Sequence, residues 1–185
     1  MAVLIKSIRK FCSGLLCAIC AVVITTVMAS QFTAVVAQSD YMAPEDFLHQ
    51  SFGSVVPESN TIWVSGELRE KATAILGHKP ASLRVRYWGD EVRSAWIIDE
   101  IGKTEPITFG VTVNQGKIEN IKVLAFRESR GWEIKHSFFS KQFLGAGLTV
   151  GQKLNRNIDG ISGATLSVKA MTNVSRLVLY LSGAL

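Results

Sequence analysis

A nine-residue segment near the end of the chain, Asp159–Ser167, holds the residue types best suited to chemistry. It combines one carboxylate with three hydroxyl side chains and two glycines. Apolar residues then recur at a helical spacing, at positions 168, 171, 174, 178 and 181, so we expect Thr165 to begin a helix. The small residues let the backbone approach a ligand closely. Because a helix N-terminus presents unpaired N–H groups and partial positive charge, the segment predicts a phosphate bound beside Thr165.

A simpler interpretation of these residues is a helix cap, since Ser and Thr are favoured at that position. A cap requires only one such side chain. Here Asp159 and Ser167 frame the Ser-Gly-Ala-Thr sequence on both sides, which favours a ligand site.

Asp159–Ser167 closely resembles the signature of FMN-binding domains, as found in the G subunit of Rnf electron-transport complexes and the C subunit of sodium-translocating NADH:quinone oxidoreductases. The resemblance implies FMN bound covalently, through a phosphoester to the last threonine of the motif. It also implies an extracytoplasmic flavin transferase that uses FAD as donor and Mg2+ as cofactor. By position, Thr165 is the attachment residue. The other expected cofactor-binding residues of the motif are Asp159, Ser162, Gly163, Ala164 and Ser167.

A weaker resemblance extends over about residues 82–182 and includes the segment Glu128–Trp132. Family members often carry Glu-Thr-Pro-Gly-Leu-Gly here, near the flavin, and Glu128 and Gly131 keep that pattern. Ser129, Arg130 and Trp132 depart from it. We expect Glu128, Gly131 and Trp132 to contribute to the flavin environment, with Trp132 either stacked on the isoalloxazine ring or packed in the core.

The first 37 residues read as a targeting segment. Three basic residues precede an uncharged run of 19 residues at 11–29, and no acidic residue occurs before Asp40. This pattern predicts a signal peptide, cleaved after Ala29 or Ala37, or an N-terminal membrane anchor. Either one places the remaining domain outside the cytoplasm, on the periplasmic side.

The composition of the remaining chain excludes several classes of function. After residue 30 there are 17 basic and 15 acidic residues, a net charge of +2, which gives no support for nucleic-acid binding. All three cysteines, at positions 12, 17 and 20, lie in the apolar run. The exported part therefore has no disulfide framework, thiolate nucleophile or Cys-ligated cluster. The three histidines have no metal-binding spacing, so we expect no metal site.

Residues 38–185 are expected to form a single FMN-binding domain of the α+β class, with a predominantly antiparallel sheet flanked by helices. A linker is expected up to Met42. The expected helices are 44–52, 65–76, a short one within 136–144, and 165–181; the expected strands are 61–64, 82–88, 92–99, 107–113 and 118–126.

We therefore expect an exported flavoprotein whose FMN passes electrons between membrane-bound or extracytoplasmic donor and acceptor proteins. No residue pair is arranged for proton abstraction, so an electron carrier is favoured over an enzyme with its own small substrate. Two alternatives stay open: a non-redox binding or scaffold module, and a flavin reductase acting on a soluble extracytoplasmic acceptor.

Overall fold

The structure is a computed structural model that describes residues 39–185. The predicted signal peptide or anchor lies outside these residues. Within the described range, no helix has the length and apolar character needed to span a bilayer.

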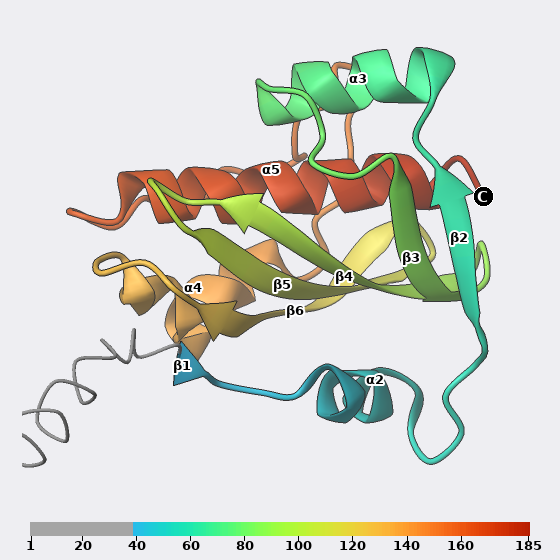
Figure 1. The fold of residues 1–185 in the computed structure, drawn as a ribbon, viewed down its shortest axis with the longest axis horizontal. Coiled ribbons are helices and arrows are strands. Elements are labelled where there is room, and N and C mark those ends of the chain that lie inside the picture. Colours follow the sequence, from blue (N-terminus) through green and yellow to red (C-terminus); the bar gives the residue numbers. More distant parts are fainter. Residues whose placement is uncertain (1–38) are drawn as a thin grey trace, which may run out of the picture. The chain divides into compact units, whose positions relative to one another are not determined.

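One antiparallel sheet of six strands forms the centre of this domain, with the strand order β1-β6-β5-β4-β3-β2 (Figure 1). The predicted α+β class with an antiparallel sheet is confirmed. Its strands are β1 (Ser39–Asp40), β2 (Ser59–Trp63), β3 (Arg84–Gly89), β4 (Arg93–Ile101), β5 (Pro106–Asn114) and β6 (Lys117–Phe126).

The hairpin β5–β6 shows why the strands form where they do. Gln115 and Gly116 connect them with positive φ angles of 49° and 70°, as a tight two-residue hairpin turn requires. The register then shifts at Thr108/Phe109 and at Thr112/Val113. These irregularities account for the imperfect alternation of apolar residues in the sequence.

Helices cover both faces of the sheet. Helix α2 (Pro44–Phe52) packs on one face with a small core around Phe47 and Leu48. Helices α3 (Gly66–Leu76) and α5 (Thr165–Ser182) lie on the other face over the main core (Figure 1). Between β6 and the last loop the chain forms three short helices, η1 (Trp132–Lys135), α4 (Ser137–Ser140) and η2 (Lys141–Phe143).

Three details differ from the sequence-based expectation. Ser39–Asp40 pairs with the end of β6, in a stretch that we expected to be linker. The helix expected at 65–76 begins at Gly66: Ser65 is its N-cap residue but makes no side-chain cap bond, and Gly77 ends the helix in the left-handed conformation. The apolar spacing predicted one buried side for the last helix, yet Ser167 and Ser175, which lie outside that spacing, are buried as well.

Helix α5 is buried almost all round because it packs on α3 as well as on the sheet. The hydroxyl of Ser175 donates to the carbonyl of Met171 at 2.8 Å, which satisfies this buried polar group inside the helix. Two packing partners leave little of α5 in contact with solvent.

Candidate functional site

Thr165 is the first residue of α5, as the sequence predicted, and its side chain is exposed. Ala164 occupies the N-cap position, and no side chain caps the helix. The interpretation of this segment as a helix cap is therefore wrong. The N–H groups of the first turn stay available to an external acceptor beside the Thr165 hydroxyl.

The loop before Thr165 leaves open space around its glycines. Gly163 has a φ of +84°, a left-handed conformation that favours glycine, and a Cβ placed there would meet no atom within 4 Å. The same holds for the space around Gly160. Ser162 is exposed, whereas Ala164 is buried beneath the turn. A ligand can therefore reach the backbone on the outer side of this loop.

The loop is held in place through a residue that the sequence analysis did not single out. The backbone N–H of Asp159 donates to Oε1 of Gln142 at 2.7 Å. Arg156 donates to the carbonyl of Leu144 at 2.6 Å and to that of Gln142 at 3.3 Å. The carboxylate of Asp159 is exposed and makes no hydrogen bond to residues 39–185. The side chains of Gln142 and Arg156 therefore fix the loop through main-chain atoms. The Asp159 carboxylate takes no part in this and is free for another partner.

Gly131 brings the two predicted site segments together. Its φ is +89°, and a Cβ built on it would lie 2.3 Å from the Oγ atom of Ser167 and 3.2 Å from that residue's Cβ. Only glycine allows this approach, so the backbone of segment 128–132 lies directly against the start of α5. Ser167 is buried by this contact region and faces Gly131 rather than the solvent.

Glu128 anchors a neighbouring turn. Its carboxylate accepts hydrogen bonds from the N–H groups of Lys103, Thr104 (2.6 Å) and Glu105 (2.9 Å), in the turn between β4 and β5. Burial opposes ionisation of this carboxyl, but the three N–H bonds outweigh it and lower the pKa of Glu128. The structure thus assigns Glu128 a positioning role in the turn that borders the site.

Trp132 follows Gly131 and is 45 % exposed, so it does not pack in the core. Its ring meets that of His136 edge-on at 5.4 Å, and the ammonium group of Lys135 lies 5.0 Å from the ring centre. An exposed indole next to the first turn of α5 is available to pack against a flat ligand. Arg130, two residues before Trp132, is also exposed.

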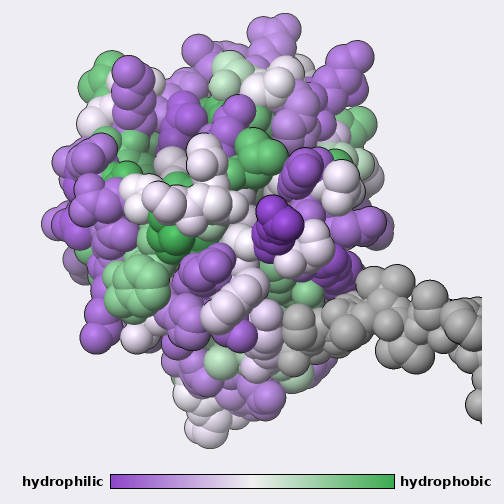
Figure 2. Space-filling view, turned by 90° about the vertical axis from the view of Figure 1, so that its left-hand side faces the viewer, coloured by the Kyte–Doolittle hydropathy of each residue, from purple (hydrophilic) through white to green (hydrophobic). Residues whose placement is uncertain are grey.

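A cavity of about 230 Å³ adjoins the first two turns of α5 on the side of β4. Leu166 and Lys169 line it from the helix, and Ile101 and Gly102 line it from the end of β4. Figure 2 views the end of the domain where α5 begins, and hydrophobic residues are visible there between hydrophilic ones. Leu166, which lines this cavity, is the residue directly after Thr165 in the helix.

A His–Glu pair lines the same cavity. Nε2 of His78 lies 2.7 Å from Oε1 of Glu100, and Nδ1 lies 2.9 Å from the carbonyl of Lys79. Both ring nitrogens thus face acceptor atoms. Nδ1 carries a hydrogen that it donates to the carbonyl of Lys79, and one further proton lies between Nε2 and the Glu100 carboxylate. The hydrogen bond to Glu100 raises the pKa of His78, and burial raises the pKa of Glu100. The side chain of Glu100 on β4 is buried, whereas that of Asp99 is exposed.

The site therefore offers an exposed threonine, free helix N–H groups, an open loop, an exposed indole and a small cavity around one helix end. Residues 39–185 contain no cluster of three potential metal ligands. The arrangement is suited to holding a phosphate next to Thr165 and a flat ring system against the neighbouring surface.

Residues 102–179 match the sequence model of the FMN-binding domain. The match runs from the turn anchored by Glu128 to the last turns of α5 and includes every predicted site residue. No curated protein and no solved structure matches the chain.

Proposed function

Because residues 102–179 of this chain belong to the FMN-binding domain family, as the motif predicted, we propose that Thr165 carries FMN through a phosphoester bond. The proposed protein is an exported flavoprotein that passes electrons between a donor and an acceptor protein at the membrane. FMN supplies reversible transfer of one or two electrons when bound; the protein supplies attachment, orientation and electrostatics.

One observation carries this proposal: the threonine hydroxyl is exposed at a helix end that no side chain caps. The N–H groups of the first turn, together with the helix dipole, would stabilise the phosphate charge without any cationic side chain. The open space around Gly160 and Gly163 fits a transferase that must reach the hydroxyl from outside.

The ring of the cofactor has two candidate walls beside this attachment point. Trp132 offers an exposed aromatic face, and the cavity lined by Leu166 and Lys169 offers an apolar surface with one cationic group. The His78–Glu100 pair lines the same cavity. The protonation state of this pair would therefore influence a ring placed there.

Mass spectrometry tests the attachment directly. Chain co-produced with a flavin transferase, FAD and Mg2+ should gain the mass of FMN less one water on the peptide that contains Thr165. Thr165→Val should abolish the gain because it removes the hydroxyl at constant shape, and Thr165→Ser should keep it. Retained covalent flavin in Thr165→Val would contradict the assignment and move it to Ser162, since Ser167 is buried.

Electron transfer needs a separate measurement. The loaded protein should show flavin absorbance that bleaches with a chemical reductant and returns with an oxidant, without turnover of a soluble substrate. Chain purified from a host with an active transferase but without flavin absorbance would favour the non-redox binding module. Steady turnover of a soluble acceptor without any membrane partner would favour a flavin reductase.

A further inference from the structure

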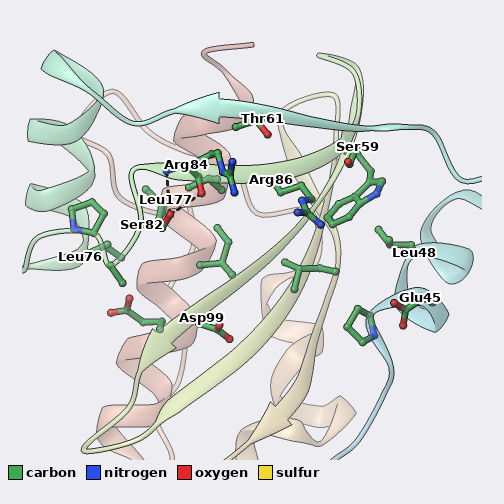
Figure 3. Close-up of a pocket in the computed structure, with 18 residues that line it drawn as sticks. Glu45, Leu48, Ser59, Thr61, Leu76, Ser82, Arg84, Arg86, Asp99 and Leu177 are labelled. Atoms are coloured by element: carbon green, nitrogen blue, oxygen red, sulfur yellow. Dashed lines mark hydrogen bonds between the residues drawn. The ribbon is translucent and has the colours of Figure 1, made fainter.

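Strands β3 and β4 pair at one end only. Their register joins Tyr87–Gly89 to Ser94–Trp96 and stops there. Residues 84–86 continue along β2, and residues 97–101 continue along β5. The sheet therefore opens between these two stretches, and a cavity of about 740 Å³ lies in the opening (Figure 3).

The walls of this cavity are mainly apolar. Ile97 and Ile98 belong to an interior strand but are only half-buried, because β3 does not cover them. Leu48 of α2 and Trp88 of β3 line the cavity as well, and Leu177 of α5 lines it from the main core. The size and the apolar lining are typical of small-molecule sites, which occupy about 300–1,000 Å³.

Two guanidinium groups, both on exposed residues, supply the positive charge of the cavity lining. Arg84 and Arg86 occupy alternate positions of β3 and therefore lie on the same side of the strand. Figure 3 shows both side chains reaching into the space between β3 and β4. Neither guanidinium group makes a hydrogen bond or an ion pair with residues 39–185. By contrast Arg93, the third arginine of this hairpin, pairs with Glu119 at 2.9 Å.

The carboxylates on the opposite wall are already engaged. Asp99 accepts a hydrogen bond from the hydroxyl of Thr108 at 2.5 Å, and Glu100 is bonded to His78. Glu45 lines the cavity from α2, apart from both arginines in Figure 3. Neither Arg84 nor Arg86 forms an ion pair with these carboxylates, so both guanidinium groups stay available to an external anion.

We propose that this cavity binds a small organic anion: a flat apolar body between Trp88 and Ile97, with a carboxylate or phosphate head held by Arg84 and Arg86. Planar guanidinium groups match both heads through paired hydrogen bonds. No residue of Asp159–Ser167 lines the cavity. Leu76 and Glu100 line both this cavity and the smaller one near α5, but the arginines and Trp88 line only the larger cavity, so the proposal does not require flavin attachment.

Ligand binding to the full chain in lipid nanodiscs tests this proposal, with empty nanodiscs as the blank. The probes are 2-naphthoate and 2-naphthyl phosphate, compared with the neutral 2-naphthalenemethanol and with acetate and inorganic phosphate. At least one naphthyl anion should bind about tenfold or more tightly than both the neutral and the small-anion probes, because head and body contribute together. The better of the two naphthyl anions identifies the head group.

Two charge-matched double variants decide whether the arginines act as proposed. Arg84→Gln with Arg86→Gln should weaken binding of the naphthyl anion by at least about tenfold. Arg69→Gln with Lys117→Gln removes the same charge at exposed positions outside the cavity and should leave binding unchanged. Equal loss in both variants would overturn the proposal, as would tight binding of the neutral probe or no binding of any probe.

Fluorine NMR locates the ligand. The chain has four tryptophans, so 5-fluorotryptophan gives four resonances that single Trp→Phe variants assign. The naphthyl anion should shift the Trp88 resonance and leave that of Trp132 in place. A shift confined to Trp132 would put the ligand at the flavin site and overturn the assignment to the cavity.

Discussion

Replacing Gly131 with alanine tests whether segment 128–132 and the start of α5 form one site. The added methyl group meets two obstacles: a backbone φ of +89° that L-residues rarely adopt, and the Ser167 Oγ atom 2.3 Å away. The left-handed conformation costs about 1–2 kcal/mol for a residue with a Cβ. Overpacking of a filled site costs about 1–3 kcal/mol more. We expect the free energy of unfolding to fall by about 2–5 kcal/mol in total.

Gly77→Ala is the matched control for the conformational part. Gly77 has a φ of +83° and a ψ of 5°, close to the 89° and 16° of Gly131, but a Cβ there meets nothing within 4 Å. This variant should lose only about 1–2 kcal/mol. Urea denaturation of the flavin-free chain measures both losses.

A second substitution isolates the steric part. Ser167→Gly removes both atoms that the new methyl group would approach most closely, so Gly131→Ala should cost no more in that background than Gly77→Ala does. Equal losses for Gly131→Ala and Gly77→Ala in the natural sequence would refute the reasoning, because the contact between the two segments would then contribute nothing.

Four further predictions concern single residues around the site. Glu128→Gln should remove part of the acid dependence of stability: the lowered pKa of Glu128 stabilises the fold above the unfolded value of about 4.3, and this contribution is lost as pH falls through the folded pKa. His78→Gln should cost about 1 kcal/mol in denaturation experiments below pH ~6.5 and progressively less as pH rises through the raised pKa of His78. Asp159→Ala should slow flavin attachment, measured by mass, with an unchanged melting temperature, because only its backbone holds the loop; attachment at the natural rate would exclude a role for the carboxylate. Trp132→Leu should change stability by less than about 0.5 kcal/mol because the ring is exposed, and should raise flavin fluorescence; unchanged fluorescence would exclude stacking.

The sequence was sufficient for most of the elements because their signals are local. Pro44 marks the start of α2, Gly77 the end of α3, and Gln115-Gly116 the turn of the β5–β6 hairpin. The position of Thr165 at the start of α5 followed from apolar spacing alone. Such features depend on neighbours within a few residues, so a single sequence contains them.

The parts that the sequence could not supply are contacts between distant segments. His78 and Glu100 come from different elements, and nothing in their local sequence indicates that they meet at 2.7 Å. Gln142 reaches the loop across 17 positions, with an ordinary polar side chain that carries no motif. The opening between β3 and β4 depends on how far the two strands stay paired, and no local feature of either strand specifies that length.

The order of strands in the sheet bears on how the chain acquires its site. From β2 to β6, each strand pairs with its neighbour in sequence, so this meander can form through local contacts, which favours rapid folding. Helix α5 is the last element of the chain and packs on β4, β5 and α3, which all precede it. The surroundings of Thr165 therefore depend on contacts with elements far upstream in the chain. A flavin transferase that recognises this folded geometry would modify only chains in which these distant segments have come together.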